Sequence, residues 1–299
     1  MDIFDTPDPI SVTLELGVGD VRVVAAERTD TTVDVRPSDP SKRGDVMAAE
    51  QTRVEYADGR LVVHAPKGWR KWSPLGPFGG RESIDVQIDV PAGSSVSGQL
   101  GVGAMRSTGR IGPFRFRTGV GEIRVDEADS VELRTGAGDV ILGRVDGAAE
   151  VTTGSGAVGI ARVDGRAVVK NGNGDTWIGE VTGDVRVNAA NGRISIDHAH
   201  AGAVAKTANG DVRLGRVERG EVVAQSAFGV VEVGVADRVA AWLDLDTKFG
   251  TVRNDLDEAE RPGSSEETVE VHAQTSMGDI TIHRSAGDVE TGISAATLR

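Results

Sequence analysis

Three consecutive segments of 18 residues decide the fold: TGAGDVILGRVDGAAEVT (135–152), TGSGAVGIARVDGRAVVK (153–170) and NGNGDTWIGEVTGDVRVN (171–188). Each has a glycine at its fourth position, followed by a short run rich in aliphatic residues. Glycines in the same setting extend the repeat in both directions, and from Gly103 to Gly229 their spacings are 17 to 19 residues. These anchor glycines are Gly19, Gly103, Gly121, Gly138, Gly156, Gly174, Gly192, Gly210, Gly229, Gly250 and Gly278. The chain is therefore built from an internal repeat.

Aliphatic residues recur at fixed offsets from the anchor glycine. They occupy the positions seven and five residues before it and two and four residues after it, as in Ala149, Val151, Val158 and Ile160 around Gly156. Two apolar positions separated by one residue have the period of a strand with one buried face. Each repeat thus holds two short strands and a third, shorter side. Eighteen residues are too few for a strand–helix–strand unit, and no segment of the repeat region has helical periodicity.

The fold class that follows is all-β, a single-stranded parallel β-helix (β-solenoid) with one 18-residue repeat per coil. Each strand pairs with its counterpart in the next coil, because a single repeat cannot bury its own core. The crossover rule favours a right-handed coil. We expect the anchor glycines to adopt positive φ. The asparagines that precede three of them, Asn173, Asn191 and Asn209, can stack as a ladder.

A family resemblance becomes specific at this point. The pattern Thr135-Gly136-Ala137-Gly138-Asp139-Val140-Ile141-Leu142, repeated along the chain, resembles the DUF4097 family of β-strand-repeat proteins. The resemblance covers residues 10–284. It implies a β-solenoid and brings an adhesin label, but it carries no general catalytic motif. The family also includes intracellular members and domains attached to envelope-stress sensors.

The repeat divides the chain into three parts. We expect residues 1–95 to form an irregular N-terminal β stack that caps the solenoid, with a basic-aromatic loop at 66–81 and a short helix near 40–50. Residues 96–284 form the solenoid of 18-residue coils. The polar stretch 255–268 is a loop insertion that explains the long gap between Gly250 and Gly278. Residues 285–299 have lost the repeat and are expected to be a C-terminal tail.

Composition excludes several classes of function. The 299 residues carry a net charge of −13, which disfavours nucleic acid and anionic membranes as partners. The sequence has no cysteine, so it offers neither disulfides nor zinc–thiolate sites. We see neither a secretory signal nor an apolar run of the roughly 20 residues that a membrane helix needs. The sequence therefore predicts a cytoplasmic protein without a transmembrane segment.

One segment differs in chemistry from all others. The run KGWRKWSPLGPFGGR (67–81) has four cations, no acid, two of the four tryptophans and a phenylalanine. Trp and Arg dominate the energetics of many protein interfaces. We therefore predict that this loop contacts a protein partner through Trp69, Arg70, Lys71, Trp72 and Phe78. Two other interpretations stay open: a loop that folds back over the core, and peripheral contact with a membrane.

The sequence offers little support for a metal or catalytic site. Asp139, Asp175 and Asp211 follow their anchor glycines, but other coils lack this aspartate, so the regular oxygen cages of calcium-binding β-rolls are not expected. His198 and His200 have the spacing of metal ligands on one strand face, yet the sequence does not show what would complete their set. We predict no metal, no cofactor and no catalytic residue.

The sequence thus favours a non-enzymatic interaction or scaffold module, either self-assembling or adhesin-like, over an enzyme. Its partner is an unidentified protein or a second copy, since the ends of a solenoid are unpaired strand edges. Two alternatives remain. One is a polysaccharide-acting enzyme, a lyase or glycosidase on a β-helix scaffold, which would need converging carboxylates of perturbed acidity. The other is a soluble module of an envelope-stress response.

Overall fold

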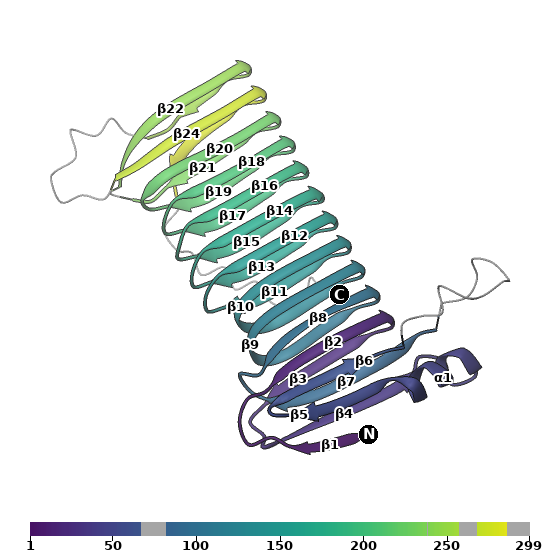
Figure 1. Cartoon of the computed structure of the whole chain (residues 1–299). Helices are drawn as coiled ribbons and strands as arrows, with labels where there is room; N and C mark the ends of the chain where they lie inside the picture. The colour runs from purple at the N-terminus through teal and green to yellow at the C-terminus, as the bar shows by residue number, and fades with distance from the viewer. Residues whose placement is uncertain (67–81, 238, 257–267, 286–299) are drawn as a thin grey trace.

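The computed structural model describes residues 1–66, 82–237, 239–256 and 268–285. These residues form a stack of β coils that runs from the N-terminal strands to β22 (Figure 1). They are almost entirely strand, with one short helix. The all-β solenoid expected from the repeat is therefore confirmed, while its handedness stays a prediction.

The strands and the helix follow one another along the chain without interruption by a second fold. The N-terminal elements are β1 (Asp2–Asp5), β2 (Ser11–Val18), β3 (Val21–Ala26), β4 (Asp30–Pro37), α1 (Arg43–Gln51), β5 (Arg53–Ala57), β6 (Arg60–His64) and β7 (Ile84–Pro91). The regular coils are β8 (Ser95–Val102), β9 (Met105–Val120), β10 (Ile123–Ala137), β11 (Val140–Val145), β12 (Ala149–Ser155), β13 (Val158–Val163), β14 (Ala167–Asn173), β15 (Thr176–Val181), β16 (Val185–Asn191), β17 (Ile194–Ala199), β18 (Ala203–Asn209), β19 (Val212–Val217), β20 (Gly220–Phe228) and β21 (Val231–Val235). The last elements are β22 (Ala240–Phe249), β23 (Val252–Asn254), β24 (Thr268–Met277) and β25 (Ile280–Arg284).

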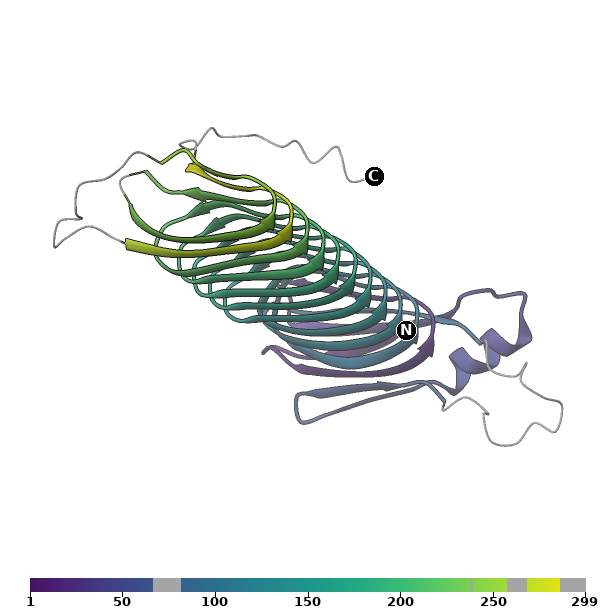
Figure 2. The same ribbon diagram turned by 90° about the horizontal axis from the view of Figure 1, so that it is seen from above.

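Each coil contributes two strands, and each strand pairs in parallel with its counterpart one repeat away. One row of strands runs β10, β12, β14, β16, β18 and β20, and the other runs β11, β13, β15, β17, β19 and β21. The register is the repeat itself, since Val169 lies opposite Val187 and Ile160 lies opposite Ile178. Seen from above, the two rows enclose a single core along the stack (Figure 2).

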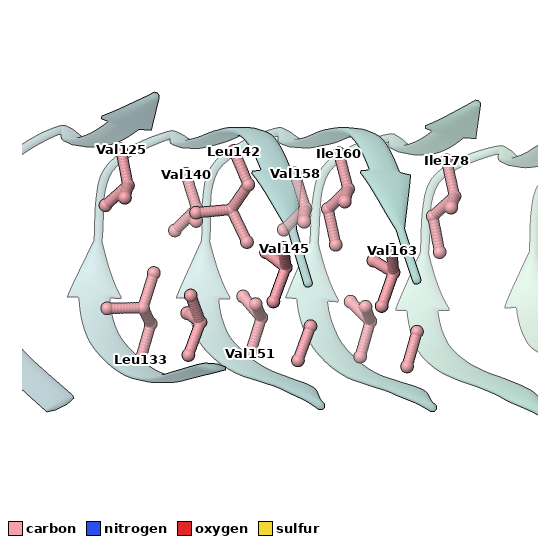
Figure 3. Close-up of a cluster of buried hydrophobic side chains, with 14 of the residues drawn as sticks. Val125, Leu133, Val140, Leu142, Val145, Val151, Val158, Ile160, Val163 and Ile178 are labelled. Carbon is pink, nitrogen blue, oxygen red and sulfur yellow. The ribbon is translucent and has the colours of Figure 1, made fainter. Parts of the chain in front are cut away.

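The apolar columns of the sequence form that core. Val125, Leu142, Ile160 and Ile178 stack along one inner wall and are at most 2% exposed (Figure 3). The expected third side is no separate strand. It is the end of the β11-type strand after a bend, because Leu142 and Val145 both face inward although they are three residues apart.

The anchor glycine is required where each coil turns. Ten of the eleven anchors among the described residues have φ between 126° and 156°, as expected. A Cβ on Gly174 would lie 2.3 Å from the carbonyl oxygen of Gly156 in the preceding coil. Threonine and serine hydroxyls under later turns donate to these carbonyls, as Ser226 does to Gly210 at 2.8 Å. The turn therefore tolerates no side chain at the anchor, for reasons of both φ and space.

Spatial order departs from chain order at both ends. At the N-terminus, β2 lies between β6 and β8, so the first coil packs directly on the regular solenoid. Beyond it, β1, β4 and β7 form antiparallel pairs, as do β5 and β6. At the other end, β24 lies between β20 and β22, so the outermost coil is β22 and β23.

The segments expected to be irregular are described only in part. Helix α1 occupies most of the 40–50 stretch for which the sequence predicts a helix. The described residues before position 95 include antiparallel pairs, whereas those after it pair in parallel. The bounds of the cap and the solenoid stay predictions. Most of the basic-aromatic loop, most of the 255–268 insertion and nearly all of the tail lie outside the described residues.

Candidate functional site

The five contact residues predicted from the sequence, Trp69, Arg70, Lys71, Trp72 and Phe78, lie outside the described residues. Their segment connects β6, which ends at His64, with β7, which begins at Ile84. Both strands belong to the N-terminal end of the stack (Figure 1). The predicted contact loop therefore starts and returns at that end, and its role stays a prediction.

The opposite end of the stack presents an open strand edge. Strand β22 pairs with β24 on one side, and its other edge has no partner among the described residues. It is ten residues long. Its inward residues Leu243 and Leu245 are only partly buried, whereas their counterparts Val271 and Ala273 in the next coil are at most 1% exposed. The solenoid core is thus incompletely covered at this end.

Large apolar side chains gather at the turn beside this edge. Phe228, Met277 and Phe249 occupy the position before the anchor glycine in the last three coils, stacked in that order. They are 54%, 50% and 69% exposed. Trp242, on the outward face of β22, is 69% exposed. We call β22 together with Phe228 and Met277 the C-terminal surface.

The turn does not require apolar residues at this position. In the middle coils it holds Asn173, Asn191 and Asn209, whose side chains form the expected ladder. The Asn191 amide donates to Asn173 at 2.7 Å, and the Asn209 amide donates to Asn191 at 2.8 Å. Val102 and Val120 are also exposed in early coils, but they are smaller. The aromatic residues at the C-terminal turns therefore have no evident structural cause.

The aspartates after the anchor glycines have a structural role that the sequence did not reveal. The Asp139 carboxylate accepts the backbone N–H of Ala157 at 2.7 Å, and Asp175 accepts that of Arg193 at 2.8 Å. In each case the acceptor lies one coil before the donor. One aspartate therefore serves the following coil, which explains why aspartate appears only in alternate coils here. This capping accounts for the broken aspartate column without calcium.

A continuous ladder of opposite charges follows the shorter side of the solenoid. The Arg144 guanidinium contacts Asp146 at 2.7 Å and Asp164 at 2.5 Å. Arg162 contacts Asp164 at 2.7 Å and also pairs with Glu180. Arginine occupies one column and acid the next, so each cation bridges two coils. Among exposed groups such pairs contribute little individually, although a network fixes side-chain positions.

The ladder ends in a cluster of two histidines and two glutamates. Here glutamate replaces the expected arginine at position 180, and histidine replaces the expected acid at position 200. His200 Nε2 lies 2.9 Å from Glu180 Oε1, and His200 Nδ1 lies 2.8 Å from Glu218 Oε2. His198 Nε2 lies 2.8 Å from Glu218 Oε1, and the two imidazole centroids are 3.8 Å apart. We call these four residues the histidine–glutamate cluster.

The carboxylate of Glu218 is the most enclosed acid of this cluster. Burial acts to raise its pKa, but hydrogen bonds from His198 and His200 outweigh burial and hold the pKa below the usual range. Arg216 Nε also donates to Glu218 Oε1 at 3.2 Å. The described contacts therefore keep this carboxylate ionised and in one place.

The carboxyl groups do not show the pattern of a glycosidase acid. A general acid of this kind needs a carboxyl pKa shifted upward. Within the described residues, the carboxyl groups whose pKa departs from its ordinary value are shifted downward: Asp30, Asp39, Glu132, Asp146 and Glu218. The hydrogen bond from Arg115 is the main cause for Glu132. The geometry therefore gives no specific support to the polysaccharide-acting alternative.

No helix within the described part of the chain is long and apolar enough to cross a bilayer.

Comparison with known proteins identifies a family. The profile of the family described as Toastrack DUF4097 matches residues 10–292. No functionally curated protein matches the sequence.

Several solved structures resemble the chain over nearly its full length. A Clostridium sporogenes protein named for cell adhesion is 13% identical, with 95% of this chain and 98% of that chain covered and a TM-score of 0.26. A Bacteroides fragilis protein named as an adhesin is 11% identical, with coverages of 94% and 96% and a TM-score of 0.32. A Parabacteroides distasonis protein named for lipid binding is 11% identical, with coverages of 95% and 96% and a TM-score of 0.30. These names are assignments only, and the low scores carry no argument about this chain.

Proposed function

The chain belongs to the Toastrack DUF4097 family, and from this premise we propose that it is a non-enzymatic interaction scaffold that pairs with a second copy through its C-terminal surface. The family membership agrees with the solenoid and brings no catalytic motif. The observation that carries the proposal is the ten-residue open edge of β22, flanked by exposed Trp242, Phe249, Phe228 and Met277.

The two ends of the solenoid differ in how they treat their edges. At the N-terminal end, the outer strands β1 and β5 are four and five residues long and pair antiparallel with their neighbours. Short, charged outer strands are a common means of preventing edge-to-edge pairing. The C-terminal edge is twice as long and carries aromatic residues. One adhesive end per molecule favours a closed dimer over a fibre, since an interface between identical surfaces uses up both of them.

The charges of β22 are compatible with pairing between two copies. The exposed alternate positions of this strand are Trp242, Asp244, Asp246 and Lys248. In an antiparallel pair of two β22 strands, Lys248 of each copy can lie opposite an aspartate of the other. Lys248 is the only cation on this strand, so it offsets repulsion between the aspartates. Partly buried Leu243 and Leu245 would be covered at the same time.

A dimer of this form would leave both N-terminal ends free. The basic-aromatic residues Trp69, Arg70, Lys71, Trp72 and Phe78 would then be displayed twice, at opposite ends of the assembly. Two copies of one contact loop bind a multivalent partner far more tightly than one copy does. We therefore retain these residues as the proposed site for a protein partner, and the cytoplasm as the proposed location.

Sedimentation equilibrium tests the dimer directly. The wild-type chain should show a monomer–dimer equilibrium, and the double variant Trp242→Thr/Phe249→Asn should weaken it at least about tenfold, because aromatic anchors dominate most interfaces. Asparagine is structurally acceptable at position 249, since the same turn position holds Asn209 in another coil. The matched control is Val120→Asn, an exposed turn residue of an early coil.

Lys248→Asp supplies a second, electrostatic test. It removes the cation that faces the aspartates of the other copy and should abolish association at low salt, while Lys248→Arg should preserve it. A wild-type chain that stays monomeric at high micromolar concentration contradicts the proposal. So does a dimer that is unaffected by both the aromatic and the charge variants.

A further inference from the structure

We propose that the histidine–glutamate cluster is a binding site for a divalent transition-metal ion such as Zn²⁺, with Glu180, His198 and His200 as its ligands. One ligand atom from each of these residues lies within 4.8 Å of the other two. Two imidazoles and one carboxylate form a donor set that suits zinc. This site uses no residue of the C-terminal surface, so it stands independently of the proposed dimer.

The backbone holds the three ligands in place. Glu180 and His198 lie opposite each other on β15 and β17, which are paired in parallel in the same sheet. His200 follows β17 by one residue, and the backbone N–H of His200 donates to the Val181 carbonyl at 3.0 Å. The ligands thus come from two adjacent coils with fixed register, and only short side-chain movements are needed to bring their atoms to zinc-binding distances of about 2.0 to 2.2 Å.

Glu218 has the position of an outer carboxylate that orients a metal-bound histidine. His200 Nε2 faces Glu180, and His200 Nδ1 lies 2.8 Å from Glu218 Oε2. Ligating histidines commonly donate their second ring N–H to such a carboxylate, which fixes the ring and its tautomer. Arg216 in turn holds Glu218 at 3.2 Å. A metal on Nε2 with the proton on Nδ1 satisfies this arrangement.

The hydrogen-bond inventory of the cluster favours a cation at its centre. A neutral imidazole donates through only one nitrogen, yet both nitrogens of His200 face carboxylate oxygens. Around the histidines, the three carboxylates of Asp164, Glu180 and Glu218 stand against the two guanidinium groups of Arg162 and Arg216. The surplus is one negative charge when both imidazoles are neutral. A divalent ion supplies positive charge where Glu180 and His200 now meet.

The site is open enough for an ion and a water to reach it. The side chains of Glu180, His198 and His200 are 31%, 24% and 28% exposed. Three protein ligands leave a fourth position for water. Because the cluster lies on the outer face and the core columns lie inside, the ion is not expected to hold the solenoid together. Removing metal with EDTA should leave the far-ultraviolet circular dichroism unchanged.

Calorimetric titration with ZnCl₂ tests the proposal, with Co²⁺ absorption as a report on coordination. The wild-type chain, freed of metal, should bind one Zn²⁺ per chain and give Co²⁺ the intense visible bands of a four- or five-coordinate site. His198→Gln and His200→Gln should each weaken Zn²⁺ binding at least about tenfold, and Glu218→Gln should weaken it by about 10- to 100-fold.

The matched control is His272→Gln. His272 also lies between two carboxylates, 3.2 Å from Asp244 and 3.0 Å from Glu270, but it has no second histidine beside it among the described residues. This variant should bind Zn²⁺ as the wild type does. The proposal is overturned if the wild type shows no stoichiometric binding. It is also overturned if the cluster variants, folded by circular dichroism, keep the wild-type affinity or if His272→Gln loses it.

Discussion

Gly174 shows how far a single residue determines each coil. Its φ of 133° is a conformation that other residues rarely adopt, and the Gly156 carbonyl fills the space a Cβ would need. The sequence predicted such positions because the same glycine recurs at fixed spacing. It did not reveal why aspartate follows the glycine in alternate coils, because the N–H group that Asp175 accepts lies 18 residues away, on Arg193.

Gly174→Ala should destabilise the solenoid by about 2 kcal/mol or more, through backbone strain and contact with Gly156. The control is Gly159→Ala on β13, where a Cβ meets nothing within 4 Å. That change should be neutral or stabilise the chain by about 0.5 kcal/mol, since alanine favours a strand more than glycine does. Thermal unfolding of both variants makes the comparison. Equal unfolding temperatures for the two variants would disprove the role given to the anchor.

Val187→Asp tests the column assignment at a buried position. Val187 is fully buried between Val169 and Ala205, and an unpaired carboxylate there should cost at least about 3 kcal/mol or prevent folding. Asn188→Asp, at the exposed next residue, creates the same side chain on the outer face and should change stability by less than about 0.5 kcal/mol. Denaturant unfolding followed by circular dichroism measures both. Similar curves for the two variants would refute the inward orientation of Val187.

Among the elements, the strands of the middle coils were predictable and the terminal strands were not. The columns fix which residues of β14 and β16 face inward, because each coil repeats the last. The order of the final coils was hidden, since β24 and β22 carry the same column pattern and either could be outermost. The histidine–glutamate cluster was hidden for a related reason. Its members lie in separate coils, and only alignment on the anchor glycine places Glu180 beside His198.

The contact between β24 and β22 should weaken as pH rises. Hydrogen bonding to Asp244 raises the pKa of His272, burial opposes this, and Glu270 adds to the rise. Because the folded pKa lies above the unfolded value of 6.5, the stabilisation is complete below pH 6.5 and is lost as pH rises through the folded pKa. His272 is exposed, so the effect is small. Hydrogen exchange of β22 amides should show protection that falls between about pH 6 and 8 after correction for intrinsic rates.

The same experiment on His272→Gln provides the control. The glutamine does not titrate, so the corrected protection of β22 should no longer depend on pH in this range. If wild type and variant show the same pH dependence, His272 does not contribute to holding the outer coil.

The whole molecule is a rod with one covered end and one open end (Figures 1 and 2). Chain topology produces the difference, because the N-terminal strands turn antiparallel while the C-terminal coil ends in the open edge of β22. The sequence predicted unpaired edges in general terms. It could not say which end stays open, since that depends on the order of strands in space. The proposed dimer follows from this asymmetry.

Distances between spin labels test the dimer most directly, because the chain has no cysteine of its own and each introduced cysteine is unique. One label would replace exposed Gln274 on β24, next to the C-terminal edge, and the other would replace exposed Glu55 on β5, at the opposite end. If two β22 strands pair, three strand spacings of about 4.8 Å separate the Gln274 positions, so electron–electron resonance should give a distance of about 15 to 25 Å. The account predicts this short distance for position 274 and none for position 55. A short distance at position 55, or none at either position in a sample that sediments as a dimer, would contradict it.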